Sequence, residues 1–131
     1  MRAVKQVFFV PERGDVIWIA LASSERKGGA GRRPALVLSP QAYNARVGLA
    51  IVCPITPLIK GYPFEVALPP GLPVEGVILA DQVSSLDWRA HRAEHICAAP
   101  SLVVEEVLGK LRALLTQGPA GPAPDLLRRL Y

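Results

Sequence analysis

Turn-forming residues interrupt this chain at close spacing, and this feature restricts its fold more than any other. Thirteen prolines and eleven glycines are distributed over 131 residues, so few segments are long enough for an extended helix. Between them we expect short strands over residues 15–21, 34–38, 49–55, 64–68, 74–80 and 92–98. The strand over 49–55 is apolar on both faces, which indicates a central position. Many short strands with turns between them predict a small, mostly antiparallel β-barrel.

One late segment has the period of a long helix. Apolar residues at 104, 107, 108, 111, 114 and 115 follow the helical repeat, so we expect a helix over 102–115 that begins after Pro100 and Ser101. A shorter helix is expected to run to about Arg46, with Ser39 as its N-cap and Pro40 in its first turn. Residues 1–116 then form one domain with an N-terminal arm over 1–13. Residues 117–131 are predicted to be a Pro/Gly linker and tail.

Composition narrows the class of protein. The length suits a single hydrophobic core. The longest apolar run, residues 49–55, is interrupted by Pro54 and cannot span a bilayer, and the run over 7–10 is too short for a secretory signal. We therefore expect a cytoplasmic protein. Cys53 and Cys97 are interpreted as small buried hydrophobic residues, because neither their spacing nor the histidines nearby suits a metal site.

The positive charge is concentrated in one third of the chain. Residues 22–62 contain six basic residues and one acidic residue, a net charge of +5, whereas the remainder has nine basic and ten acidic residues, a net charge of −1. The segment over residues 22–33 lies within this basic region and contains three glycines. We expect it to be a long loop with a binding role. Such a patch suits a polyanion such as nucleic acid, although solvated loops also collect lysine and arginine.

Five motifs carry a family resemblance. They are GDVIWI at 14–19, GRRPALVLSP at 31–40, YN at 43–44, KGYPFEV at 60–66, and LADQV at 79–83 followed by WRA at 88–90. In this order, over roughly residues 12–115, they resemble the MazF/PemK family of toxin endoribonucleases. The resemblance implies a homodimer of SH3-like barrels of the CcdB/PemK type, each with a C-terminal helix. It also implies metal-independent cleavage of single-stranded RNA at a short sequence, no cofactor, and an antitoxin whose flexible acidic segment occupies the RNA groove.

Arg33 and Thr56 are the expected catalytic residues. When RNA is cut without a metal, its 2′-hydroxyl attacks the adjacent phosphorus, and the protein must stabilise the added charge and move two protons. The resemblance assigns catalysis to the arginine before proline, Arg33, whose planar guanidinium suits a phosphorane. Thr56 matches the catalytic threonine and could donate to a phosphate oxygen. The alternatives are a solvated loop charge for Arg33 and a local backbone hydrogen bond for Thr56.

Further residues are expected to bind RNA: Arg32, Lys60, Tyr62, Asp81, Gln82, Trp88 and Arg89. Tyr62 and Trp88 could stack on unpaired bases, although Trp88 suits core or interface packing equally well. Asp81 matches a residue with an acid–base role in plasmid-type relatives, but Leu79 stands where those relatives carry arginine. A structural hydrogen-bonding role for Asp81 therefore stays open.

The general base is left open by the sequence. Many relatives carry an acidic residue where this chain has Gly28, and Glu25 could substitute only if the loop folds back. Arginine is a poor base because its guanidinium hardly deprotonates. Two other functions stay possible at this stage: a non-catalytic toxin on the same barrel that inhibits DNA gyrase, as in the CcdB branch, and an RNA-binding barrel without activity.

Overall fold

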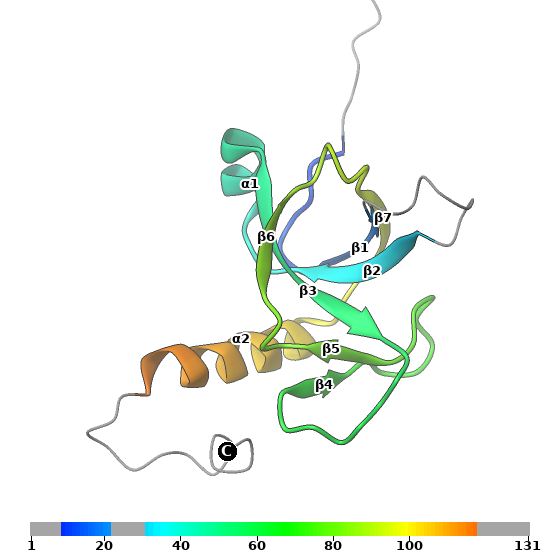
Figure 1. The fold of residues 1–131 in the computed structure, drawn as a ribbon, viewed down its shortest axis with the longest axis vertical. Coiled ribbons are helices and arrows are strands. Elements are labelled where there is room, and N and C mark those ends of the chain that lie inside the picture. The colour runs from blue at the N-terminus through cyan, green and yellow to red at the C-terminus, as the bar shows by residue number, and fades with distance from the viewer. Residues whose placement is uncertain (1–8, 22–30, 118–131) are drawn as a thin grey trace, which may run out of the picture.

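The computed structural model describes residues 9–21 and 31–117 of the chain. The predictions for the tail beyond residue 117, for most of the N-terminal arm and for the loop that contains Glu25 and Gly28 lie outside these residues. Figure 1 shows the elements in chain order: β1 (Asp15–Ala20), β2 (Arg32–Val37), α1 (Gln41–Val47), β3 (Leu49–Thr56), β4 (Glu65–Ala67), β5 (Val77–Leu79), β6 (Ser84–Asp87), β7 (Glu94–Ala98) and α2 (Ser101–Thr116).

The sheet is organised around β3, as the sequence predicted. One edge of β3 pairs with β2, while its first half pairs with β6 on the other edge and its last two residues pair with β5. The strand pairings of the described residues are antiparallel, in the order β4-β5-β3-β2-β1-β7 with β6 beside β3. The expected β fold with a C-terminal helix is confirmed. Among the described residues the pairings leave the sheet open, with β4 and β7 at its ends.

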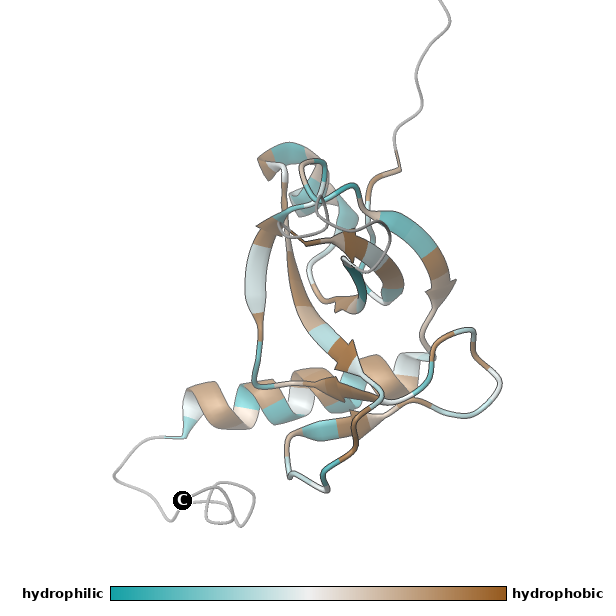
Figure 2. Ribbon diagram, turned by 45° about the vertical axis from the view of Figure 1, so that its right-hand side comes forward, coloured by the Kyte–Doolittle hydropathy of each residue, from teal (hydrophilic) through white to brown (hydrophobic). Residues whose placement is uncertain are grey.

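Two hydrophobic clusters stabilise the fold. Successive side chains of a strand point to opposite faces, so neighbours in β2 and β3 enter different clusters. Leu36 and Cys53 pack in the cluster that contains Val104 and Val107 of α2, whereas Val37 packs on the other face with Val52 and Trp88. Figure 2 shows hydrophobic segments on both β3 and α2. In the described part of the chain, neither helix is long and apolar enough to cross a membrane.

The structure corrects three details of the predicted strands. β6 was not predicted, because three of its four residues are exposed and it has no apolar alternation; its pairing with β3 creates the strand. The last strand begins at Glu94 instead of Arg92, which has a left-handed φ of 52°. β2 begins at Arg32, so Pro34 lies within it. Pro34 lies opposite Trp18 of β1, and the pairing with β3 begins only at Ala35, so on that side no ladder bond is lost.

The start of α1 also differs from the prediction. Pro40 occupies the N-cap position and makes no side-chain capping bond. Ser39 points inward instead: its hydroxyl donates to Asn44 Oδ1 (2.6 Å) and accepts from the Ile51 N–H (2.8 Å). The Ser39 side chain therefore joins α1 to β3 and does not cap the helix.

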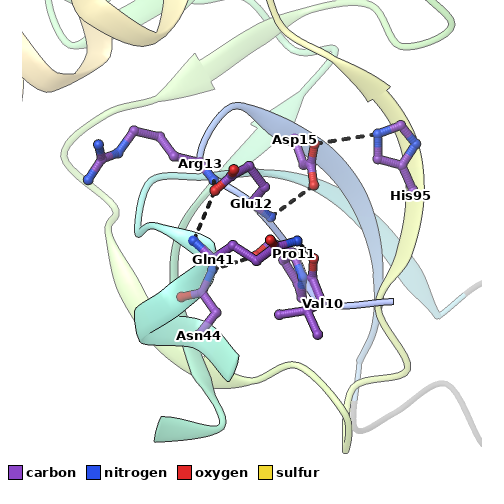
Figure 3. A network of polar contacts seen from close by, with 8 residues as sticks. All are labelled: Val10, Pro11, Glu12, Arg13, Asp15, Gln41, Asn44 and His95. Atoms are coloured by element: carbon purple, nitrogen blue, oxygen red, sulfur yellow. Dashed lines mark hydrogen bonds and ion pairs between the residues drawn. The ribbon is translucent and has the colours of Figure 1, made fainter. Parts of the chain in front are cut away.

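Asn44 is the centre of this buried polar network. It is fully buried, and its Nδ2 donates to the carbonyls of Pro11 (2.8 Å) and Ser39 (3.0 Å). Its backbone carbonyl accepts from Trp88 Nε1 at 2.9 Å. Figure 3 shows Asn44 beneath Gln41, with Pro11 and Val10 alongside. One amide thereby ties α1 to the segment before β1.

Replacing Asn44 with alanine should lower the free energy of unfolding by about 2–4 kcal/mol, because several buried polar groups lose their partners. Gln41→Ala is the matched control, since it removes one exposed hydrogen bond to the Val10 carbonyl and should cost less than about 0.5 kcal/mol. Urea denaturation of both variants measures the difference. Equal losses would contradict the central role of Asn44.

Candidate functional site

An open cavity of about 270 Å³ lies where β3 ends and the chain turns toward β4. It is lined by residues of β2, β3, the β3–β4 connection, β4 and the β5–β6 region: Arg33, Pro54, Ile55, Thr56, Leu58, Lys60, Tyr62, Glu65, Leu79 and Gln82. Five residues expected at the site are thus brought together from separate parts of the sequence: Arg33, Thr56, Lys60, Tyr62 and Gln82.

The register between β2 and β3 explains why Arg33 and Thr56 share this cavity. Ala35 pairs with Pro54 and Val37 pairs with Val52. Arg33 lies two residues from Ala35 and Thr56 two residues from Pro54, so each projects from the same face as its neighbour in that pair. Directly opposite residues in an antiparallel pair project from the same face of the sheet. The guanidinium and the hydroxyl therefore project into one cavity from two neighbouring strands.

The Thr56 hydroxyl is held by its own backbone. Its Oγ1 accepts a hydrogen bond from the Leu58 N–H at 3.1 Å, which is the local bond that the sequence left as an alternative. This bond uses the oxygen as an acceptor and does not consume the hydroxyl hydrogen. Thr56 is therefore oriented by the turn and still has a proton to donate into the cavity.

Gly76 supports Thr56 from behind, and sequence reasoning missed it. Gly76 has a φ of +122°, and a Cβ added there would overlap the carbonyl group of Thr56 and crowd the Cα of Pro57. Only glycine allows this close approach of two backbones. The requirement depends on a contact across twenty residues, so the glycine alone gave no signal for it.

Glu65 is a second residue that sequence reasoning missed. One carboxylate oxygen accepts the Lys60 N–H and the other accepts the Gly61 N–H, both at 3.0 Å. Gly61 has a left-handed φ of +79°, which favours glycine at this turn. The only signal in the sequence was the position of Glu65 within KGYPFEV, a motif that was assigned to the family but not to a contact.

Tyr62 and Asp81 form a pair at the edge of the cavity. The Tyr62 hydroxyl donates to Asp81 Oδ2 at 2.7 Å, so the structural role left open for Asp81 is present. Asp81 Oδ1 is buried and has no hydrogen-bond partner within the described residues. The carboxylate also acts on Cys53: burial first, and the Asp81 charge second, raise the pKa of this thiol to about 12. Cys53 is therefore neutral and buried.

Trp88 and Arg89 do not join the cavity. Trp88 is only 2 % exposed and packs in the core, so the prediction that it stacks on unpaired bases is wrong and the packing alternative holds. The Arg89 guanidinium lies 4.9 Å from the Trp88 ring centroid. Both follow β6, whose Asp87 pairs with Leu49 at the first residue of β3. Thr56 ends that strand, seven residues or about 23 Å further along.

Arg32 lies on the opposite face of β2 from Arg33. Its guanidinium is 4.3 Å from the Trp18 ring centroid and 3.7 Å from Glu94 Oε1. Adjacent strand residues point to opposite faces, so the two consecutive arginines cannot serve the same cavity. The expected phosphate contact of Arg32 is not part of the site that contains Thr56.

Comparison with known proteins agrees with this architecture. Residues 12–115 match the model of the family described as the PemK-like, MazF-like toxin of type II toxin–antitoxin systems. The chain belongs to this family. The matched residues coincide with the range over which the motifs resembled it, and they include Arg33 and Thr56.

Relatives and solved structures support membership. The endoribonuclease toxin MazF of Escherichia coli K12 is 48 % identical over 85 residues, which cover 65 % of this chain and 76 % of the relative. The endoribonuclease toxin ChpB of the same strain is 40 % identical over 111 residues, covering 79 % and 93 %. A crystal structure of MazE–MazF from Deinococcus radiodurans matches with a TM-score of 0.76 and 52 % identity, covering 84 % of this chain and all of that one.

The cysteines and acidic residues are the side chains that could bind a metal ion or take up a proton. Both cysteines are free; Cys53 is buried as expected, while Cys97 is only half-buried. Within residues 9–21 and 31–117, no three side chains of His, Cys, Asp or Glu lie together as a metal site would require. Glu65 is the acidic side chain among those that line the cavity.

A substitution at Gly76 tests its contact with Thr56. Gly76→Ala should destabilise the fold by about 2–4 kcal/mol, because it adds an overlap with the Thr56 backbone to the strain of a positive φ. Gly71→Ala is the matched control, because Gly71 also has a positive φ (+96°) but open space around its Cβ position. It should cost about 1–2 kcal/mol. Equal decreases in the free energy of unfolding, measured by urea denaturation, would show that the contact with Thr56 does not add to the cost of the substitution.

Proposed function

We propose that this chain is a toxin endoribonuclease that cuts single-stranded RNA, mRNA above all, at a short specific sequence. The observation that carries the proposal is that Arg33 and Thr56 line one cavity with Lys60, Tyr62 and Gln82. The cavity offers two cations, a hydroxyl, an amide and an aromatic ring. These groups suit a phosphodiester flanked by unpaired bases. The endoribonuclease names of the relatives MazF and ChpB support the same function.

The proposed reaction is an internal transesterification without a metal ion. The ribose 2′-oxygen loses its proton and attacks the adjacent phosphorus, the bond from phosphorus to the 5′-oxygen breaks, and the departing 5′-oxygen takes up a proton. The products are a 2′,3′-cyclic phosphate and a 5′-hydroxyl. Arg33 stabilises the negative charge that builds on the phosphorane, because its guanidinium stays charged and can bind two oxygens. Thr56 donates its hydroxyl hydrogen to a phosphate oxygen from the end of a rigid strand.

Neighbouring residues bind and orient the RNA in this proposal. Lys60 contacts a phosphate as a mobile point charge. Gln82 offers both a donor and an acceptor for a base edge. Tyr62, whose hydroxyl is engaged by Asp81, presents its ring for stacking on a base. The stack requires that the ring be held in place, and the bond to Asp81 provides this.

We also infer the partners and location of the chain. The structures it resembles include MazE–MazF complexes from Deinococcus radiodurans, which supports neutralisation by a cognate antitoxin. A flexible acidic segment of that antitoxin would compete with RNA for Arg33 and Lys60. The functional form is proposed to be a homodimer in the cytoplasm.

The first test uses the substrate. A labelled single-stranded RNA should be cut with a chelator present, leaving a 2′,3′-cyclic phosphate and a 5′-hydroxyl. An oligonucleotide with hydrogen in place of the 2′-hydroxyl at the mapped cut site should remain intact, because the nucleophile has been removed. Primer extension maps the site, and end-group analysis identifies the products. Cutting of the 2′-deoxy substrate would contradict the mechanism.

The second test uses the two consecutive arginines. Arg33→Ala should lower kcat by about 10²–10³-fold, because it removes the charge that stabilises the transition state. Arg32→Ala removes the same charge one residue away on the opposite face, and kcat should stay within about threefold. Single-turnover cleavage measures both. Folded Arg33→Ala protein that still arrests growth while cellular RNA stays intact would contradict a nuclease.

A further inference from the structure

The β3–β4 loop, residues 57–64, carries two of the side chains proposed to bind RNA. Lys60 and Tyr62 both line the cavity from this loop. Arg33 and Thr56, in contrast, lie on paired strands. The position of the RNA-binding side chains therefore depends on how the loop is held, separately from the position of the catalytic pair.

The cavity side of the loop is held by Glu65. Its two carboxylate oxygens accept the backbone N–H groups of Lys60 and Gly61. The Glu65 N–H in turn donates to the Tyr62 carbonyl at 3.0 Å, closing a turn with Pro63 at its second position. These three bonds fix the backbone from Lys60 to Glu65.

Lys110 of α2 holds the same segment from the helix. Its Nζ donates to the carbonyls of Pro63 (2.8 Å) and Glu65 (3.1 Å), the residues on either side of the buried Phe64. Its third contact is an ion pair with Glu106 Oε2 at 3.5 Å. Two of the three ammonium donors thus bind backbone carbonyls, and the charge is paired with a carboxylate. The side chain is only 22 % exposed, so these bonds are largely shielded from water.

We propose that Lys110 is a positioning residue for RNA binding: from the helix, it fixes the β3–β4 loop so that Lys60 and Tyr62 face the cavity. This inference rests on the proposed function. Lys110 contacts backbone carbonyls and touches neither the cavity nor the RNA. Its removal changes where the loop side chains lie and leaves the pairing of β2 with β3, and hence Arg33 and Thr56, in place.

Steady-state cleavage of an RNA that spans a mapped cut site tests the proposal. Lys110→Met keeps the length of the side chain and removes the ammonium; it should raise KM about tenfold and leave kcat within about threefold, because the interactions lost bind ground state and transition state alike. Lys110→Gln, which can still donate to one of the two carbonyls, should raise KM by an intermediate factor. Thermal melting of each variant verifies folding at the assay temperature.

Glu106→Gln is the matched control. It removes the ion pair and leaves both carbonyl bonds of Lys110, so KM should stay within about twofold. An increase in KM as large as that of Lys110→Met would overturn the proposal, because the effect would then follow the ion pair and not the loop contacts.

A double-variant cycle separates positioning from general destabilisation. If Lys110 acts through the loop, Lys110→Met should raise KM by less than about threefold in a Lys60→Ala background, since the side chain it positions is already absent. The proposal is overturned if KM of the double variant rises by the product of the two single-variant increases. It is also overturned if Lys110→Met alone leaves KM unchanged. Cleavage by the wild-type protein is measured before any variant is compared. Wild-type protein that leaves the RNA uncut would contradict the proposed function itself.

Discussion

The pairing register of β2 with β3 decides which side chains enter the cavity. With Ala35 opposite Pro54 and Val37 opposite Val52, Arg33 and Thr56, each two residues beyond the first pair, project from the same face of the sheet. A shift of β2 by one residue would transfer each of its side chains to the other face of the sheet. Arg32 would then replace Arg33 at the cavity, and the buried residues that β2 contributes to the two clusters would change sides. The burial of Leu36 and Val37 in separate clusters therefore also determines which of the two arginines reaches the cavity.

The acidic groups in and beside the cavity are occupied by the protein itself. Glu65 accepts two backbone N–H groups and Asp81 accepts the Tyr62 hydroxyl. The carboxylates thus order the loop and the tyrosine, while Arg33 and Lys60 supply positive charge to the cavity. A site that contains both signs of charge can in this way still present a cationic surface to a phosphodiester.

Local sequence pattern was enough to predict the elements that carry Arg33 and Thr56. The apolar runs over β1, β2 and β3, the period of α2, and the concentration of basic charge are all short-range features, and they located Arg33 at a strand start and Thr56 at a strand end. What could not be predicted depends on contacts between distant residues. β6 exists because β3 offers it an edge. Trp88 is buried because it packs against side chains of β1, β2 and β3, and the Asn44 carbonyl receives its indole N–H. Gly76 matters because the Thr56 backbone passes behind it.

The central position of β3 also has a consequence for the order of folding. Its partners come from residues 32–37 on one side and from 77–79 and 84–87 on the other, and the helix that holds the β3–β4 loop follows later still. Contacts so far apart in sequence form only after the entropy of closing the intervening loops has been overcome. A growing polypeptide that already contains Arg33 and Thr56 therefore has no complete sheet around β3 until residue 87 has emerged, and the loop that carries Lys60 and Tyr62 is held from the helix only once residue 110 follows.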